Sequence, residues 1–500
     1  MYRQVWCAMT GTRVPTAGGD TLPPPRNLAG VLLPYPEYKD SKLPWMDIVP
    51  EHWEIIRSKY VFREVEERSQ FGEEIHLAMS QKLGLIPSSE LKERRLHSDS
   101  YAGAKLCQVD DIVMNRLKAH LGVFALARQA GMVSPDYTVF RQIQPVDGKY
   151  FELLFKNPIF RPELIRKAKG IVMGFWRLYT DDFYNIRLPV PPISEQQSIV
   201  RYLQYQDQII NRYLLSKRRL IDHLVEQKQA IINNAVTRGI DSNVRLKPSG
   251  IEWFGEVPEH WEIKPLKRWV GINKCVLPEN TEPDYSFNYL DIGSVGTGYL
   301  IKQPGKIRFK NSPSRARRIL RTGDTIISTV RTYLKAIYFV DSNNGNLVAS
   351  TGFAVLTPKE NIFPEYLSYL IQSNVFVDHV TANSVGIAYP AIAETKIGTF
   401  HVALPPTQEE QKKILNDIKI KTASIDTTIH QTQNGINLIR EYRTRLIADV
   451  VIGKVDVRDI EITDEEPVDN DVVHELDELD DNDHNDDDNH DDNDDDEKDE

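Results

Sequence analysis

The sequence predicts an α+β protein built from two α/β globules, each followed by a long helix, with the two helices pairing as an antiparallel coiled coil. Three observations support this fold class: a heptapeptide that occurs twice, two proline-free stretches with helical periodicity, and two central regions with a similar strand pattern. Because the parts recur in the same order, we expect an internal duplication with pseudo-two-fold symmetry. The 500 residues are enough for several domains.

The repeated heptapeptide lies near the start of each half. V-P-E-H-W-E-I begins at Val49 and again at Val257, and seven repeated residues that include Trp and His do not recur by chance. A second match joins L-P-V-P-P-I-S-E-Q-Q from Leu188 with V-A-L-P-P-T-Q-E-E-Q from Val402. The positions paired by this match are Pro191 with Pro405, Pro192 with Pro406, Glu195 with Glu409, and Gln197 with Gln411.

The centres of the two halves share a pattern more than a sequence. D-I-V-M-N-R-L-K-A-H-L-G-V-F-A-L from Asp111 and D-T-I-I-S-T-V-R-T-Y-L-K-A-I-Y-F-V from Asp324 are both rich in β-branched and apolar residues. Each predicts a pair of strands. Glycine-containing stretches from Ala168 and from Asn383 predict loops at equivalent places.

Each half ends in a predicted long helix. Ser194 with Gln197, and Thr407 with Glu410, have the spacing of a capping box after a Pro-Pro pair, which predicts that helices begin there. Downstream, apolar residues recur every three or four positions without an intervening proline. About 40 residues at roughly 1.5 Å each give a rod near 60 Å. Packing of each helix on its own globule is the alternative, but this length favours pairing of the two rods.

The charge is unevenly distributed along the chain. The net charge of −11 arises because residues 456–500 hold 25 acidic and 2 basic residues, whereas the rest holds 59 Lys and Arg against 47 Asp and Glu. The basic body is compatible with a nucleic-acid partner, and the acidic tail has too few apolar residues to fold. No apolar run is long enough to span a membrane. Widely spaced cysteines predict a reduced, cytoplasmic protein; they are Cys7, Cys107 and Cys275.

These signals together predict seven consecutive segments. They are a disordered extension (1–37), a first globule (38–193), a central long helix (194–238), a linker (239–252), a second globule (253–406), a C-terminal long helix (407–452) and a disordered acidic tail (453–500).

Four motifs resemble a known family, the specificity (S) subunits of type I restriction–modification enzymes. They are W-x-G-E-V-P-E-H-W-E-I from Trp253 with a weaker copy at Trp45, L-P-x-P-P-x-x-E-Q-Q from Leu188, G-M-V-S-P-D-Y-T-V-F-R from Gly131, and R-L-I-A-D-V-V-I-G-K-V-D-V-R from Arg445. The resemblance extends over most of the chain, from Tyr38 to Arg458, and leaves out the first 37 residues and the acidic tail.

The resemblance implies that each globule is a target-recognition domain that reads one half of a bipartite double-stranded DNA target. It further implies that the helices set the spacing of the half-sites and dock methyltransferase (M) subunits, in a complex that also takes restriction (R) subunits. The family implies no catalytic site and no cofactor in this chain. S-adenosylmethionine, ATP and Mg are implied for the partner subunits of what would be a DNA methyltransferase and ATP-dependent endonuclease.

Basic residues in the divergent centres are the candidate DNA contacts. Arg315, Arg317 and Arg318 lie in a run of cations without acids, which suits phosphate contacts, although a solvated surface loop is an equal alternative. One further pair of cations recurs in both halves, as Arg331 and Lys335 in the second half and as Arg116 and Lys118 in the first. This recurrence favours DNA contacts, and charges at a strand edge are the alternative. A shorter cluster at Lys92, Arg94 and Arg95 predicts a helix face.

Trp53 and Trp261 lie in the two copies of the heptapeptide, which form a duplicated frame outside the divergent centres. We therefore expect them to be core anchors and not base-stacking residues. Asn157-Pro158-Ile159-Phe160 resembles an adenine methyltransferase signature, but the second proline is missing and no glycine-rich cofactor turn precedes it, which favours a helix-ending turn. The functional alternative is a standalone DNA-binding or scaffold protein that never joins an enzyme.

Overall fold

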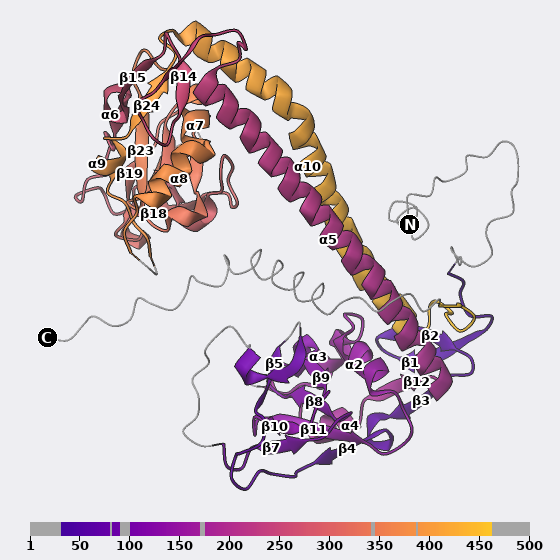
Figure 1. Cartoon of the computed structure of the whole chain (residues 1–500). Coiled ribbons are helices and arrows are strands. Elements are labelled where there is room, and N and C mark those ends of the chain that lie inside the picture. Colours follow the sequence, from indigo (N-terminus) through magenta and orange to yellow (C-terminus); the bar gives the residue numbers. More distant parts are fainter. Residues whose placement is uncertain are drawn as a thin grey trace, which may run out of the picture. The chain divides into compact units, whose positions relative to one another are not determined.

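A computed structural model describes residues 32–80, 83–90, 101–170, 176–341, 346–386 and 389–462. The chain divides into two compact units, each containing one globule and one portion of both long helices (Figure 1). Within the described residues, unit 1 comprises 32–216 and 435–462, and unit 2 comprises 217–434. Unit 1 is therefore assembled from two separate stretches of chain, whereas unit 2 is one continuous stretch.

Unit 1 is built around a four-stranded antiparallel sheet. Its strands, in spatial order, are β4 (Phe62–Val65), β11 (Tyr137–Gln142), β8 (Ile112–Asn115) and β9 (Phe124–Leu126). Four two-stranded sheets surround it: β1 (Tyr38–Leu43) with β2 (Met46–Pro50), β3 (Glu54–Arg57) with β12 (Arg187–Val190), β5 (Leu77–Ser80) with β6 (Gly84–Pro87), and β7 (Lys105–Cys107) with β10 (Gly131–Val133).

Among its described residues, the globule of unit 1 also has three short α-helices: α2 (Gly148–Lys156), α3 (Arg161–Lys167) and α4 (Thr180–Tyr184). They enclose a core dominated by phenylalanine, in which Phe140 stacks on Phe183 at 4.5 Å between ring centroids and Phe62 meets Phe151 edge to face at 5.1 Å. Large buried rings supply much of the apolar area that stabilises such a small sheet.

Unit 2 repeats the central sheet. Its strands follow the same spatial order: β16 (Val270–Ile272), β23 (Phe353–Pro358), β20 (Thr325–Ser328) and β21 (Ile337–Phe339). The frame strands also recur, as β13 (Leu246–Pro248) with β14 (Glu256–Pro258), and β15 (Glu262–Pro265) with β24 (His401–Leu404). The matching order confirms the predicted duplication, and the β8–β9 and β20–β21 pairs confirm the two predicted strand pairs.

The two globules differ beside this common sheet. Unit 2 has a second four-stranded sheet in the order β18 (Gly305–Arg308), β17 (Ser286–Leu290), β22 (Leu347–Ser350) and β19 (Ala316–Ile319). Strands β17 and β22 are parallel, and the other pairs are antiparallel. Its helices are α6 (Leu266–Trp269), α7 (Pro364–Gln372), α8 (Asn374–Ala382) and α9 (Glu394–Ile397).

The two long helices are α5 (Ile193–Arg238) and α10 (Gln408–Val451), and they pair in antiparallel fashion in both units (Figure 1). In unit 1, Arg443 Nη2 lies 2.6 Å from Asp207 Oδ1, and in unit 2, Lys228 Nζ lies 2.6 Å from Asp426 Oδ1. A later position on α5 thus meets an earlier position on α10. The predicted coiled-coil pairing is confirmed, and because these surface ion pairs contribute little, the apolar stripes hold the rods together.

The helix ends also pack on the globules, so the alternative considered from the sequence describes part of the structure. In unit 2, Val236 of α5 and Ile418 of α10 belong to the same buried cluster as Trp261 and Leu367 of the globule. In unit 2, the globule and the helix ends that it contacts therefore share one hydrophobic core.

The two predicted capping boxes have different outcomes. The hydroxyl of Thr407 accepts a hydrogen bond from the Glu410 amide at 3.3 Å, as expected of a helix cap, while the Glu410 carboxylate contacts Trp261 of the globule. The prediction for Ser194 is wrong, because α5 begins one residue earlier and the carbonyl of Pro192 accepts the amides of Glu195 and Gln196. Ser194 therefore lies inside the first turn.

Candidate DNA interface

In each unit, the repeated heptapeptide is attached to a long helix through one glutamate of that helix. In unit 1, Glu195 accepts hydrogen bonds from Trp53 Nε1 at 2.8 Å and from the Tyr35 hydroxyl at 2.5 Å, and it pairs with His52 Nε2 at 2.6 Å. Burial and the hydrogen bond to Glu195 raise the pKa of Tyr35 well above its ordinary value, so this hydroxyl stays a donor.

The same attachment recurs in unit 2 with one donor fewer. Glu410 accepts from Trp261 Nε1 at 2.9 Å and pairs with His260 Nε2 at 2.9 Å. Both Trp53 and Trp261 are fully buried, which confirms their interpretation as core anchors and leaves no ring face for stacking on a base.

This geometry corrects the register that the sequence match suggested. The match paired Glu195 with Glu409, but the residue that performs the same role in unit 2 is Glu410. One residue on, Gln196 accepts the backbone amide of Asp147 at the start of α2, and Gln411 accepts the amide of Phe363 at the start of α7. Gln196 is therefore the counterpart of Gln411, in place of Gln197. An extra residue between the proline pair and the helix in unit 2 shifts the spacing.

The predicted basic cluster of unit 2 separates into exposed and engaged residues. Arg315 is exposed, beside the start of β19. Arg317 lies over the ring of Phe309, with 5.0 Å between its Cζ atom and the ring centroid. Arg318 is mostly buried, with 16% of its side chain exposed, and its Nη2 lies 3.5 Å from Glu394 Oε1. Arg318 is thus positioned to stabilise the fold, while Arg315 is free of such burial.

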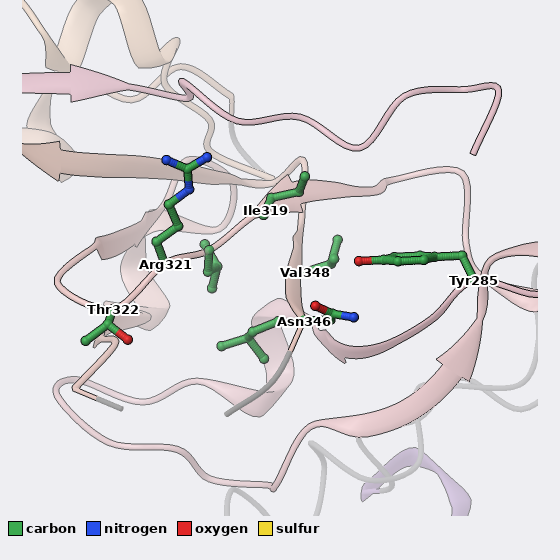
Figure 2. A pocket seen from close by; sticks show the side chains of 8 residues that line it. Tyr285, Ile319, Arg321, Thr322, Asn346 and Val348 are labelled. Atoms are coloured by element: carbon green, nitrogen blue, oxygen red, sulfur yellow. The ribbon is translucent and has the colours of Figure 1, made fainter. Parts of the chain in front are cut away.

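An open hollow of about 200 Å³ lies beside this cluster in unit 2 (Figure 2). Tyr285 lies on one side of Val348, and Arg321 and Thr322 lie on the other. Its described lining residues include one cation and no carboxylate. The cation, Arg321, suits an anionic group.

The two predicted basic residues of unit 1 also differ in their surroundings. Arg116 donates from Nε to the Asp136 carbonyl at 2.8 Å and from Nη2 to the Pro135 carbonyl at 3.1 Å, so its guanidinium holds a neighbouring loop. Lys118 is exposed and directly precedes the one-turn helix η3 (Ala119–Leu121).

Unit 2 has the counterpart of this turn in η6 (Thr332–Leu334), which Arg331 precedes. The residues that follow the two turns, Gly122 and Lys335, both have left-handed backbones, with φ of 81° and 50°. The structure therefore pairs Lys118 with Arg331 and Gly122 with Lys335. The correspondence expected from the sequence, Arg331 and Lys335 with Arg116 and Lys118, is shifted.

A matched pair of substitutions tests this equivalence. Gly122→Ala should destabilise unit 1 by about 1–2 kcal/mol, because the left-handed backbone disfavours a Cβ and the added atom would lie 3.1 Å from the Phe155 carbonyl oxygen. Lys335→Gly should leave the stability of unit 2 within about 0.5 kcal/mol of the parent, since relief of strain offsets the entropy gained by the unfolded chain. Urea unfolding of the full chain measures both, and equal losses would contradict the assignment.

The methyltransferase-like sequence is structural. Asn157 is the C-terminal cap of α2, its side-chain oxygen accepts the Ile159 amide at 3.0 Å, and its Nδ2 donates to the Ala448 carbonyl at 3.3 Å. The predicted helix-ending turn is confirmed. Among the described residues, no group of three or more His, Cys, Asp or Glu could hold a metal ion, and no helix is long and apolar enough to cross a membrane.

Five predicted features fall partly or wholly outside the described residues. They are the cluster at Lys92, Arg94 and Arg95, residues 1–31 of the extension, residues 463–500 of the acidic tail, and parts of the two glycine-containing loops, 171–175 and 387–388.

Comparison with known proteins finds similarity to one family. Residues 258–438 match the model of the type I restriction modification DNA specificity domain. The MjaVIII specificity subunit of Methanocaldococcus jannaschii is 24% identical over 284 residues, which is 56% of this chain and 64% of the relative. The HindI specificity subunit of Haemophilus influenzae is 32% identical over 184 residues, or 34% of this chain and 39% of the relative. The chain thus spans less than two thirds of the length of these curated relatives.

A solved chain from a type I R-M system, studied for complex assembly and conformational transition, has the same fold with a TM-score of 0.56. The likeness covers 81% of this chain and 99% of the solved one at 14% identity, so it concerns the fold alone. Residues 258–438 are therefore similar to the type I restriction modification DNA specificity domain, which confirms the resemblance inferred from the motifs.

Proposed function

We propose that the chain is the DNA sequence-specificity subunit of a type I restriction–modification complex. Each globule reads one half of a bipartite double-stranded DNA target, and the paired helices set the spacing between the half-sites. The observation that carries this proposal is the pair of units with the same sheet order and the same glutamate-anchored frame around divergent centres. A reader of two different half-sites needs this combination, because different bases require different side chains on a common scaffold.

In this proposal, other subunits of the complex carry out the methylation and cleavage of DNA. The α5 and α10 pair docks methyltransferase subunits, and restriction subunits join the same complex. S-adenosylmethionine, ATP and Mg then belong to those partners, and this chain supplies recognition and geometry alone. Co-expression with its genomic neighbours separates this function from a standalone DNA-binding or scaffold protein, because only the former co-purifies with methyltransferase subunits.

Exchange of one globule is the direct functional test. Replacing residues 45–190 with those of a relative should change one half of the methylated sequence and leave the other half and the spacer intact, because unit 1 alone carries the exchanged segment. Sequencing of methylated sites in the host genome gives both halves in one measurement. The reciprocal exchange of 253–404 is the matched control and should alter the other half. If either exchange altered both halves, modular recognition would be wrong.

A further inference from the structure

The one-turn helices η3 and η6 are each joined to a second loop in the same way. In unit 1 the amide of Leu178 donates to the Arg116 carbonyl at 3.1 Å, and in unit 2 the amide of Ile392 donates to the Thr329 carbonyl at 2.8 Å. Just before these contacts, each second loop is closed by a pair of mutual backbone hydrogen bonds. The closing pairs are Lys169 with Arg177, and Val385 with Ala391.

An aromatic ring from each second loop packs against the turn. Trp176 meets His120 edge to face at 5.3 Å between ring centroids in unit 1. In unit 2, the guanidinium carbon of Arg331 lies 4.9 Å from the centroid of the Tyr389 ring. The ring fixes the direction of the neighbouring polar side chain, and a guanidinium held over a ring keeps its planar face and donors ordered.

Both turns project apolar side chains into solvent beside a cation. Leu121 is 43% exposed after Lys118 in unit 1, and Leu334 is 39% exposed after Arg331 in unit 2. The first residue of each turn is buried, and in unit 2 this residue, Thr332, is also held by a 2.9 Å hydrogen bond to Ser384. The turns are thus anchored from below while their outer side chains face solvent.

The backbone of unit 2 is strained at this place. Arg331 and Lys335, which flank η6, both have φ of 50°, a conformation that L-residues with a Cβ rarely adopt. Strain of this kind persists where the surrounding structure enforces it, and it concentrates at functional loops. The exposed Tyr333 and Leu334 lie between these two residues, in the connection that joins β20 to β21.

We propose that these turns and their packed rings form a tip surface that contacts base edges of double-stranded DNA, and that its variable side chains determine which bases each unit reads. The tip surface is Lys118, His120, Leu121 and Trp176 in unit 1, and Arg331, Tyr333, Leu334 and Tyr389 in unit 2. This inference rests on the proposed function and names the residues that carry it out.

The pattern of what is shared and what differs favours DNA over a docked protein. The residues that anchor each globule to its long helix, a His, a Trp and a Glu, are the same in both units, because they have the same structural role there. At the tip surface the cation and the leucine recur, whereas His120 is replaced by Tyr333 and Trp176 by Tyr389. A cation suits phosphates or guanine and an exposed leucine suits a thymine methyl, while the differing side chains suit different half-sites.

The test uses the full chain co-expressed with its methyltransferase subunits, with methylated sites sequenced in the genomic DNA of the expression host. Tyr333→Ala/Leu334→Ala should relax base preference by about ten-fold at one or more positions of a single half-site, the change expected for one lost base contact. His120→Ala/Leu121→Ala should do the same in the other half-site. Lys306→Ala/Arg308→Ala, which removes exposed cations of β18 that are not part of the tip surface, should weaken methylation uniformly without changing the sequence preference.

A conservative exchange guards against misfolded variants. Arg331→Lys/Tyr333→His places the unit 1 tip residues on the unit 2 turn and should shift the preference in the half-site that unit 2 reads.

The outcomes distinguish a failure of the proposed function from a failure of the tip surface alone. A wild-type complex that methylates without sequence specificity would overturn the proposed function itself. A specific wild-type complex whose recognised sequence is unchanged in the alanine pairs and in the exchange would overturn the tip surface alone. Tip variants that lose the methyltransferase subunits on purification would replace DNA with a protein partner at this surface.

Discussion

Replacing Glu195 with alanine is expected to destabilise unit 1 by about 3 kcal/mol, whereas Glu410→Ala should destabilise unit 2 by about 1 kcal/mol. The difference follows from burial and from the number of donors. Glu195 is 3% exposed and accepts from two buried donors, Trp53 Nε1 and the Tyr35 hydroxyl. Removal of the carboxylate leaves both without an acceptor in a place that water cannot reach. Glu410 is 30% exposed, so water can satisfy the Trp261 donor when the carboxylate is lost.

Urea unfolding followed by tryptophan fluorescence measures both losses, and hydrogen exchange assigns each loss to its unit. Glu195→Gln is the graded control, because it keeps one acceptor oxygen for the indole and should fall between the parent and the alanine variant. Equal destabilisation by Glu195→Ala and Glu410→Ala would show that the extra buried hydroxyl contributes nothing.

Gly453→Ala is the second large effect, with an expected loss of about 3 kcal/mol in the free energy of unfolding. Gly453 has φ of 75°, and a Cβ placed there would lie 2.7 Å from Pro50 Cδ and 2.9 Å from Trp53 Cη2. Neither the proline ring nor the buried indole can rotate away, so the frame must shift as a whole and open the contact between Trp53 and Glu195.

Gly239→Ala is the matched control for this substitution. Gly239 has the same φ of 75° and the same kind of neighbours, but the atoms nearest to an added methyl carbon, Trp261 Cζ2 and Pro258 Cγ, would lie 3.5 and 3.8 Å from it. This variant therefore carries only the backbone strain of about 1 kcal/mol. A calorimetric comparison of the two variants isolates the steric part, and a Gly453→Ala loss no larger than that of Gly239→Ala would contradict it.

The fold could be predicted from the sequence because its strongest signals are local or repeated. The heptapeptide at Val49 and Val257 reveals the duplication, and the helical periodicity after each Pro-Pro pair reveals α5 and α10 within one residue at either end. The capping motif at Ser194, however, led to a wrong prediction. The backbone carbonyl of Pro192 accepts the first helical amides, which the Ser194 side chain was expected to accept.

The candidate site could be predicted less well, because its residues depend on partners far along the chain. Nothing near Arg318 in the sequence indicates its ion pair with Glu394, and nothing near Arg116 indicates that its guanidinium holds the Pro135–Asp136 loop. The equivalence of Lys118 with Arg331, in contrast, was available in the sequence, because the segments that begin at Asp111 and Asp324 align without a gap and place these two residues at the same position.

The backbone contact between Leu33 and Asp456 affects the order in which the two units can fold during translation. The amide of Asp456 donates to the Leu33 carbonyl at 2.8 Å, and Gly453 lies against Pro50, so the first frame is completed by residues from the end of α10. Unit 2 is continuous between 217 and 434 and has all of its parts once those residues have left the ribosome. Unit 1 must wait, with its early strands already synthesised, until the last helix emerges. We therefore expect the second globule to fold first during translation, so that premature termination before Asp456 leaves unit 2 formed and unit 1 exposed to proteases.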